Sequence, residues 1–200
     1  MRRLVIETSG ADCSIALIED GEIIAERHEH VGRGHAERLI PWIGALPDGG
    51  RADEVIVGCG PGSFTGVRIA IAAARGLGLG WGIPVRGVSS LALVAAGRDD
   101  AALTVAVEGG HGEIFVQDFA GAPFAETGPL RSLTPEAAGA ACLNPVVIGS
   151  GAERLVAARG FGEAIPAEAR AANVRFLPET ALLLPARPVY GRGADARPMA

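Results

Sequence analysis

The feature that most constrains the fold is a repeated order of segments in the two halves of the chain. VIETSGADCSIAL, which starts at Val5, has the layout of VAVEGGHGEIFV, which starts at Val105: strand, acidic residue, glycine turn, strand. VIVGCGPGS from Val55 matches VVIGSGAER from Val146 in the same way, and each predicts a strand, a Gly-x-Gly turn and a helix. Such internal similarity indicates a duplicated unit.

Two copies of a strand–strand–helix–strand–helix unit predict an α/β protein with two lobes. The layout is that of the actin-like ATPase (ASKHA) fold, in which Glu7 and Glu108 would face each other across a cleft. We expect an N-terminal lobe over residues 1–100, a smaller C-terminal lobe over 101–190 and a disordered tail over 191–200.

The composition narrows both the chemistry and the location. All 18 basic residues are arginine, so mechanisms that need a lysine, such as a Walker-type phosphate loop or a Schiff base, are excluded. The net charge of -5 disfavours a protein that grips nucleic acid alone. Three cysteines lie in apolar runs and predict buried thiols. No run suits a signal peptide or a membrane span, so we expect a soluble, cytoplasmic protein.

The glycine-rich stretch GPGSFTGVR, Gly60 to Arg68, has only the outline of a phosphate-binding loop. A Walker loop needs G-x-x-x-x-G-K-[ST], but Val67 stands where the lysine belongs. A dinucleotide-binding loop needs a third glycine where Thr65 lies. We therefore interpret the stretch as a turn in which Ser63 caps a helix that runs to Gly80.

That helix carries very little side-chain bulk, because alanine and glycine make up much of it. Each interior glycine costs about 1 kcal/mol of helix stability relative to alanine, so the helix needs close neighbours. We expect one face to meet the sheet and the other to meet a partner protein. Arg68 and Arg75 are seven residues apart and therefore share one face, which favours solvated or partner-facing charges over catalytic ones.

Several segments resemble one known family. IETSGADCSIAL, GHAERLIPWI, GCGPGSFTGVRIAIAAARGLGLGWGIPVRGVSSL and the late PVYGR occur in an order and spacing that closely resemble the TsaB (YeaZ) family of tRNA threonylcarbamoyladenosine biosynthesis proteins, within the glycoprotease-like group. The similarity is dense over Arg3 to Leu91 and thin from Ala101 to Pro188. Its most specific part is GPGSFTGVR with the downstream GVSSL.

The resemblance implies the actin-like fold and a non-catalytic role, that of a pseudoenzyme subunit. TsaB-like proteins are partners of TsaD, which transfers a threonylcarbamoyl group to the adenosine next to the tRNA anticodon, and the ATPase TsaE joins the complex. On this basis tRNA, and ATP or ADP with magnesium, would be met only in the complex. Pairing with TsaD, or with a second copy as a homodimer, would use the helices His35 to Leu46 and Phe64 to Leu79.

The interface implied by the resemblance lies on these two helices, whose small residues would let a partner approach closely. The residues assigned to it are His35, Arg38, Leu39, Trp42, Val67, Arg68, Ile71, Ala74, Arg75 and Gly78.

The resemblance also implies a vestigial nucleotide cleft, which would be formed by Glu7, Ser9, Asp12, Glu108 and Gly109. Departures from the family pattern weaken this cleft. The usual Asp-Thr-Ser after the first strand begins here with Glu7, and the usual Asp-Ala-Arg of the second lobe is Glu-Gly-Gly from Glu108. The usual late Tyr-Leu-Arg is Tyr-Gly-Arg from Tyr190.

The residues themselves do not predict a catalytic site. TsaD-like relatives carry an HxxxH metal pair on the first helix, whereas His35 is followed four residues later by Leu39. His28 and His30 are interpreted as exposed polar side chains in preference to a metal site, and His111 as part of a surface turn in preference to an acid–base group. We assign no catalytic residue, no metal ligand and no resident cofactor.

Two functions of different classes are therefore carried forward. The favoured one is a TsaB-like scaffold that positions TsaD. The alternative is a nucleotide-binding actin-like-fold ATPase or kinase, with Glu7, Asp12 and Glu108 around a magnesium nucleotide. Binding of a magnesium nucleotide by the isolated chain separates the two.

Overall fold

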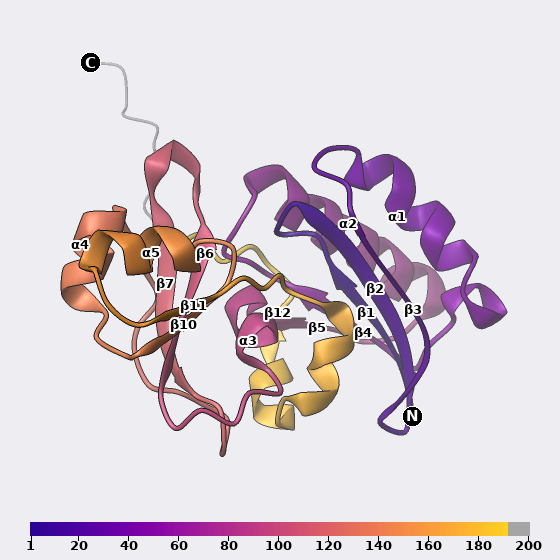
Figure 1. Ribbon diagram of the computed structural model, residues 1–200. Coiled ribbons are helices and arrows are strands. Elements are labelled where there is room, and N and C mark those ends of the chain that lie inside the picture. Colours follow the sequence, from indigo (N-terminus) through magenta and orange to yellow (C-terminus); the bar gives the residue numbers. More distant parts are fainter. Residues whose placement is uncertain (192–200) are drawn as a thin grey trace.

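The computed structural model describes residues 1–191, whose elements form two lobes (Figure 1). The first lobe contains β1 (Arg2–Glu7), β2 (Asp12–Glu19), β3 (Glu22–His30), α1 (His35–Gly44), the 3-10 segment η1 (Pro47–Gly50), β4 (Glu54–Gly58), α2 (Phe64–Trp81), β5 (Val85–Val88) and α3 (Ser90–Ala95). The second contains β6 (Leu103–Glu108), η2 (Gly110–Gly112), β7 (Ile114–Ala120), β8 (Ala125–Glu126), β9 (Arg131–Leu133), α4 (Pro135–Ala141), β10 (Val146–Ile148), α5 (Ala152–Arg159) and β11 (Glu163–Ile165). The 3-10 segments η3 (Ala171–Phe176) and η4 (Glu179–Leu182) then lead to β12 (Leu184–Pro185).

Both lobes have the same strand pairing, which confirms the duplicated unit. In the first sheet, β1 pairs antiparallel with β2 and parallel with β4, and β4 pairs parallel with β5. In the second, β6 pairs antiparallel with β7 and parallel with β10, and β10 pairs parallel with β11. The full strand orders are β12-β5-β4-β1-β2-β3 and β11-β10-β6-β7-β8, with β9 also paired to β7.

The central strand β1 is apolar on both sides because helices cover both faces of its sheet. Leu4 and Ile6 point into a core that they share with residues of α1 and α2. Val5, between them, points into the opposite core with residues of α3 and η3. This two-residue alternation follows from the geometry of a strand, and α1 and α2 consequently form the outer layer of the first lobe (Figure 1).

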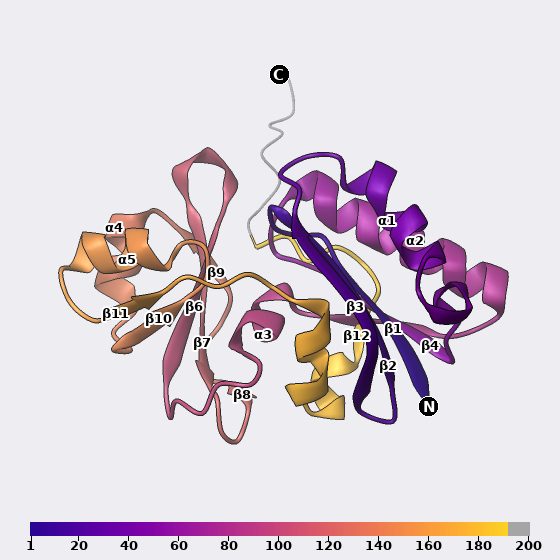
Figure 2. The same cartoon turned by 45° about the vertical axis from the view of Figure 1, so that its right-hand side comes forward.

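A middle layer joins the lobes, because α3 and η3 lie between the two sheets (Figure 2). Leu91 and Leu93 of α3 share one continuous core with Val5 of the first sheet and with Leu103 and Phe119 of the second. The lobes are therefore held together by apolar packing around α3 and η3.

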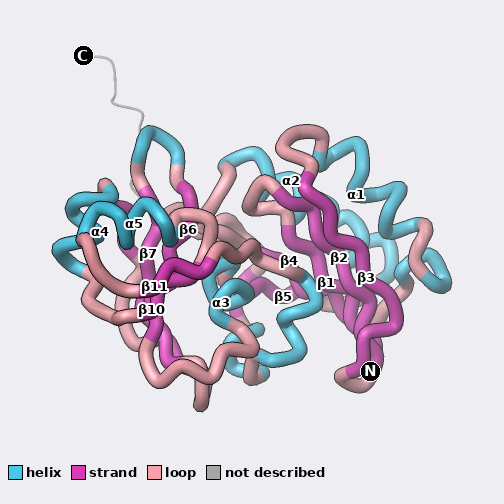
Figure 3. Tube along the Cα trace, viewed as in Figure 1, coloured by secondary structure: helices cyan, strands magenta, loops and turns pink. Residues whose placement is uncertain are grey.

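The C-terminal part of the chain returns to the first lobe, in contrast to the predicted boundary at residue 190. β12 pairs antiparallel with β5, at the edge of the first sheet, and η3 and η4 lie beside that sheet (Figure 3). Residues 171–185 were assigned to the C-terminal lobe. That assignment is wrong because β12 pairs with β5 of the first sheet, a strand about a hundred residues earlier in the chain. Of the predicted disordered tail, residues 192–200 lie outside the described part of the chain.

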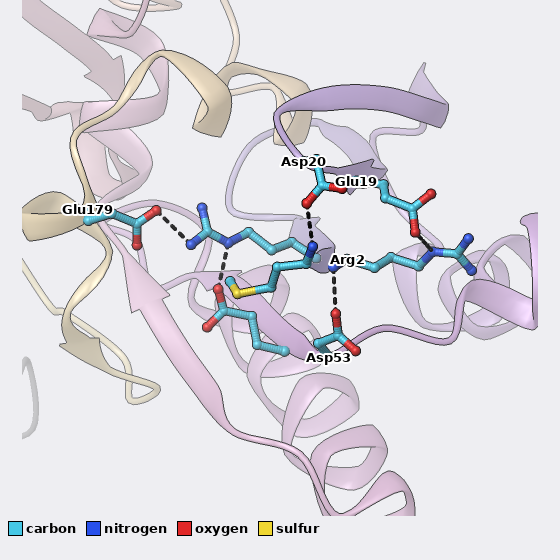
Figure 4. Close-up of polar contacts among 8 residues, drawn as sticks. Arg2, Glu19, Asp20, Asp53 and Glu179 are labelled. Atoms are coloured by element: carbon cyan, nitrogen blue, oxygen red, sulfur yellow. Dashed lines mark hydrogen bonds and ion pairs between the residues drawn. The ribbon is translucent and has the colours of Figure 1, made fainter.

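Polar side-chain contacts connect the N-terminal strand β1 to three other parts of the structure, one of which is the returning C-terminal segment. Arg2 pairs with Glu19 at 3.2 Å, and its backbone N–H donates to Asp53 at 2.7 Å (Figure 4). Its neighbour Arg3 pairs at 2.6 Å with Glu179 of η4. The N-terminal strand is thus linked to β2, to the residues before β4 and to the C-terminal segment.

Candidate functional site

In the loop before α2, the backbone N–H groups of Gly60 and Ser63 form hydrogen bonds with other residues of the chain. The hydroxyl of Ser63 accepts a hydrogen bond from the N–H of Gly66 at 3.2 Å, which confirms the predicted cap, and the N–H of Ser63 donates to the carbonyl of Ser9 at 2.7 Å. The N–H of Gly60 donates to the hydroxyl of Ser90 at 3.1 Å. These N–H groups are the ones that a phosphate-binding loop would direct at its ligand, so their internal bonds favour a structural turn.

Close packing also fixes the first turn of α2 against the turn after β1. The hydroxyl of Thr8 donates to the carbonyl of Gly66 at 2.7 Å. A Cβ at Gly66 would lie 2.0 Å from the carbonyl oxygen of Thr8, so a glycine is required at this position. The helix then runs to Trp81 and ends where Gly82 adopts a left-handed φ of 69°.

Most of the predicted partner interface faces the core of its own lobe. Within α2, Val67, Ala74 and Gly78 lie on the stripe that packs on the sheet, and a Cβ at Gly78 would lie 2.3 Å from a methyl carbon of Val85. Seven of the ten residues are buried in this chain: His35, Leu39, Trp42, Val67, Ile71, Ala74 and Gly78. Their assignment to a partner interface stays a prediction.

The outward face of α2 consists of residues that recur at helical spacing, and it includes two of the predicted interface residues, Arg68 and Arg75. Arg68, Ala72, Arg75 and Leu79 follow one another at intervals of four, three and four, and all are exposed. Leu79 is 88% exposed, and nothing lies within 4 Å of a Cβ built at Gly76. On the neighbouring α1, Arg38 and Ile40 are exposed as well. We call the exposed residues of α1 and α2 the outer face.

A cleft of about 880 Å³ lies between the lobes. Of the five predicted cleft residues, Ser9 and Glu108 line it, whereas Glu7, Asp12 and Gly109 are absent from its wall. Glu108 pairs with Arg154 of α5 at 2.6 Å, so its charge is compensated within the second lobe.

Glu7 is buried behind the cleft wall, because its hydrogen-bond partners Ser9 and Ser90 line the cleft and Glu7 itself does not. The predicted arrangement of Glu7 facing Glu108 across the cleft is therefore wrong. The carboxylate of Glu7 accepts hydrogen bonds from the hydroxyl of Ser90, at 2.6 Å, and from the N–H of Ser9. The side chain is fully buried, and this burial raises the pKa of the Glu7 carboxyl above its usual value, because a charged carboxylate loses its hydration there. Glu7 joins the loop before α2 to the start of α3.

Asp12 forms a local polar cluster with two histidines. Its carboxylate lies 2.9 Å from Nε2 of His28 and 2.8 Å from Nδ1 of His30. The ring of His35 is buried, with Nε2 3.3 Å from the carbonyl of Asp12. Within residues 1–191, no group of three or more His, Cys, Asp or Glu side chains is arranged to hold a metal ion.

Two features of the cleft escaped sequence analysis. The first is a cluster at its mouth: the guanidinium of Arg68 donates to the hydroxyl of Tyr190 at 3.1 and 2.8 Å and lies 3.4 Å from the ring centroid of Phe64. The PVYGR motif marked Tyr190 as notable, but no local pattern pairs it with a residue 122 positions earlier. The second is Glu168, whose partial burial raises its carboxyl pKa.

Among the helices of residues 1–191, none combines the length and the apolar composition that a membrane-spanning helix needs.

The duplicated strand order, the helices on the outer faces and the cleft between the lobes define a two-lobed actin-like ATPase fold, as predicted. A family model described as "TsaD: tRNA N6-adenosine threonylcarbamoyltransferase" matches residues 22–126, more than half of the 200-residue chain. The chain belongs to this family, and its relatives place it in the TsaB (YeaZ) group.

Among the relatives, the tRNA threonylcarbamoyladenosine biosynthesis protein TsaB of Escherichia coli (strain K12) is 38% identical over 128 residues, which cover 60% of this chain and 55% of that protein. The protein of the same name from Bacillus subtilis (strain 168) is 37% identical over 101 residues, which cover 48% of this chain and 44% of that protein. The chain thus spans about half the length of the curated relatives that it matches.

Two solved structures from Pseudomonas aeruginosa match nearly the whole chain. One, described as YeaZ, is 27% identical with a TM-score of 0.79, over 94% of this chain and 99% of that chain. The other, an uncharacterized protein with similarity to peptidase YEAZ, is 26% identical with a TM-score of 0.81, over 96% of this chain and 99% of that chain. The similarity in fold therefore extends through the second lobe.

Proposed function

We propose that this chain is a non-catalytic partner of TsaD in the formation of N6-threonylcarbamoyladenosine on tRNA. Its relatives in E. coli and B. subtilis are named for threonylcarbamoyladenosine biosynthesis, and the matching family model is named for the transferase. In this proposal TsaD carries out the transfer to the adenosine next to the anticodon, and TsaE joins a larger assembly. The chain meets tRNA, and ATP or ADP with magnesium, only within the complex.

The outer face is the single observation that carries the proposal. The inner stripe of α2 already satisfies the core of the first lobe, yet Phe64 and Leu79 remain exposed on its outer side, as does Ile40 on α1. Between them lie small residues such as Gly76 and Ala72, over which a partner backbone can approach closely. Large apolar side chains exposed on one side of a helix pair form a surface that a protein partner can cover.

The state of the cleft supports the absence of catalysis. In the alternative ATPase or kinase, Glu7 would direct its carboxylate at a magnesium nucleotide, but that carboxylate is buried against Ser90 and Ser9. Glu108 is engaged by Arg154, and the N–H groups of Gly60 and Ser63 in the loop before α2 are bonded within the chain.

The direct test places bulk on the outer face without disturbing the lobe. Gly76→Leu adds a side chain where nothing lies within 4 Å and improves helix propensity by about 1 kcal/mol, so the variant should fold at least as well as the wild type. Ala157→Leu, on an exposed position of α5, is the matched control. Each protein is mixed with TsaD of the same organism and examined by light-scattering chromatography.

The proposal predicts a heterodimer for the wild type and for Ala157→Leu, and about tenfold or more loss of affinity for Gly76→Leu. A wild type that forms no complex, or a Gly76→Leu variant that binds unchanged, would overturn it. Saturable binding of magnesium ATP by the isolated chain would favour the ATPase or kinase instead.

A further inference from the structure

The charge of the outer face is opposite in sign to that of the whole chain. α2 contains Arg68 and Arg75 and no acidic residue, and α1 contains Arg38 and Glu37. The two helices therefore carry three arginines against one glutamate, in a chain whose net charge is -5. All other acidic residues of the chain lie outside these two helices.

The arginines of the outer face also differ from most others in their partners. Several arginines of the first sheet and of the second lobe are matched by carboxylates, as in the pairs Arg3–Glu54 at 2.6 Å and Arg154–Glu108 at 2.6 Å. Within residues 1–191, no carboxylate lies within ion-pair distance of Arg38, Arg68 or Arg75. These three arginines therefore have no carboxylate partner on a face that also exposes Ile40, Phe64 and Leu79.

Arg68 is held in place for such a contact. Tyr190 accepts two hydrogen bonds from its Nε and Nη2 atoms, and Phe64 stacks beneath its guanidinium. These contacts leave Nη1 without a partner among the described residues. A fixed guanidinium loses less entropy when it binds a carboxylate, and arginine and aromatic side chains are enriched among the residues that dominate interface affinity.

We propose that the partner covering the outer face presents carboxylates to Arg68 and Arg75, and that this charge pairing selects a different protein over a second copy of the chain. The inference rests on the proposed function and specifies the chemistry of the partner. In a symmetric homodimer the same face meets itself, so the arginines of two α2 helices would meet a surface that offers a single acidic residue per chain, Glu37 of α1. Like charges brought together in this way cost free energy.

Nucleic acid is the less suitable occupant of the same face. Phosphates would satisfy the arginines but would leave Ile40, Phe64 and Leu79 exposed to water. A protein surface with carboxylates around an apolar centre matches both properties of the outer face.

The test uses Arg75→Glu, because Arg75 is exposed and makes no contact that the fold requires. Arg75→Lys preserves the charge, and Arg175→Glu, an exposed arginine on η3, applies the same change of charge elsewhere. Calorimetry measures the affinity of each full-length protein for TsaD at about 50 mM and about 500 mM salt, which span weak and strong screening. Thermal melting checks that each variant is folded.

The inference predicts that Arg75→Glu weakens binding by about tenfold or more, that Arg75→Lys loses less, and that Arg175→Glu binds as the wild type. High salt should weaken the wild-type complex more than that of Arg75→Glu. A wild-type complex that is indifferent to Arg75→Glu and to salt would overturn the inference alone. So would a homodimer, or a tRNA complex, that Arg75→Glu disrupts. Failure of the wild type to bind TsaD at low salt would overturn the proposed function and this inference together.

Discussion

At the scale of single residues, Glu7 is the side chain whose environment departs most from expectation. Its position after β1 suggested a carboxylate at the wall of a cleft, but it is buried against the hydroxyl of Ser90. Burial raises the pKa of the Glu7 carboxyl in the folded protein, so folding takes up a proton at this site. The stability that Glu7 contributes is full below its unfolded pKa and is lost as the pH rises through the folded pKa.

Glu7→Gln should therefore change the pH dependence of stability. Glutamine has no charge to bury, so the variant should gain stability relative to the wild type as the pH rises from about 4.5, the ordinary pKa, toward 8. Urea denaturation of both proteins across this range measures the difference. A wild type that gains on the variant as the pH rises would show that the buried carboxylate is stabilised as the anion.

At the scale of elements, α2 has an inner stripe that packs on the sheet and an outer stripe that faces away from it. The two stripes differ in whether they have room for a side chain larger than glycine. Gly78 lies against β5, where a Cβ would meet Val85 at 2.3 Å, whereas a Cβ at Gly76 would meet open space. Gly78→Ala should therefore destabilise the protein by about 1–3 kcal/mol despite its better helix propensity. Gly76→Ala should stabilise it by about 1 kcal/mol. Equal effects of the two substitutions in chemical denaturation would contradict this assignment of the stripes.

The existence of α2 could be predicted from sequence, but its orientation could not. The cap at Ser63 and the terminating Gly82 are local signals, and they place the ends of the helix within a residue or two. The orientation of a helix is predicted from the contrast between an apolar face and a polar face. A helix with alanine or glycine on both faces shows little such contrast. Ala74 and Gly78 therefore looked as suitable for a partner as Gly76, and only the packing against Val85 separates them.

At the scale of the whole molecule, Arg3 and Arg86 of the first sheet bind both Glu54 of that sheet and Glu179 of the returning C-terminal segment. The side chain of Glu54 is 3% exposed and pairs with Arg3 of β1 at 2.6 Å and with Arg86 of β5 at 3.4 Å. Glu179 of η4 reaches the same two arginines, at 2.6 and 4.0 Å. The carboxylates of β4 and η4 thus neutralise a pair of arginines that would otherwise repel each other.

Glu54→Ala should cost about 2 kcal/mol or more of the free energy of unfolding, because it leaves two arginines without their buried counter-charge. The value is reduced by the access of both arginines to water. Glu19→Ala removes the exposed partner of Arg2 and should cost about 0.5 kcal/mol or less. Guanidinium denaturation compares the two, and similar losses would show that burial of Glu54 has no special weight.

The duplication could be predicted because it repeats local signals, namely strand, turn and helix in the same order. The return of residues 171–185 could not, because β12 has two residues and its pairing with β5 is a long-range contact. The cluster of Phe64, Arg68 and Tyr190 was missed for the same reason. Local pattern determines the elements, whereas these contacts arise from tertiary packing.

The outer face of α2 is the proposed docking surface for a partner protein. A photo-reactive amino acid at Leu79, which is 88% exposed, tests this contact in the assembled state, with the same probe at Ala157 of α5 as the control. Illumination should crosslink the Leu79 probe to TsaD and leave the Ala157 probe without a crosslink. A crosslink from Ala157 alone, or none from Leu79 in a complex that demonstrably forms, would contradict it.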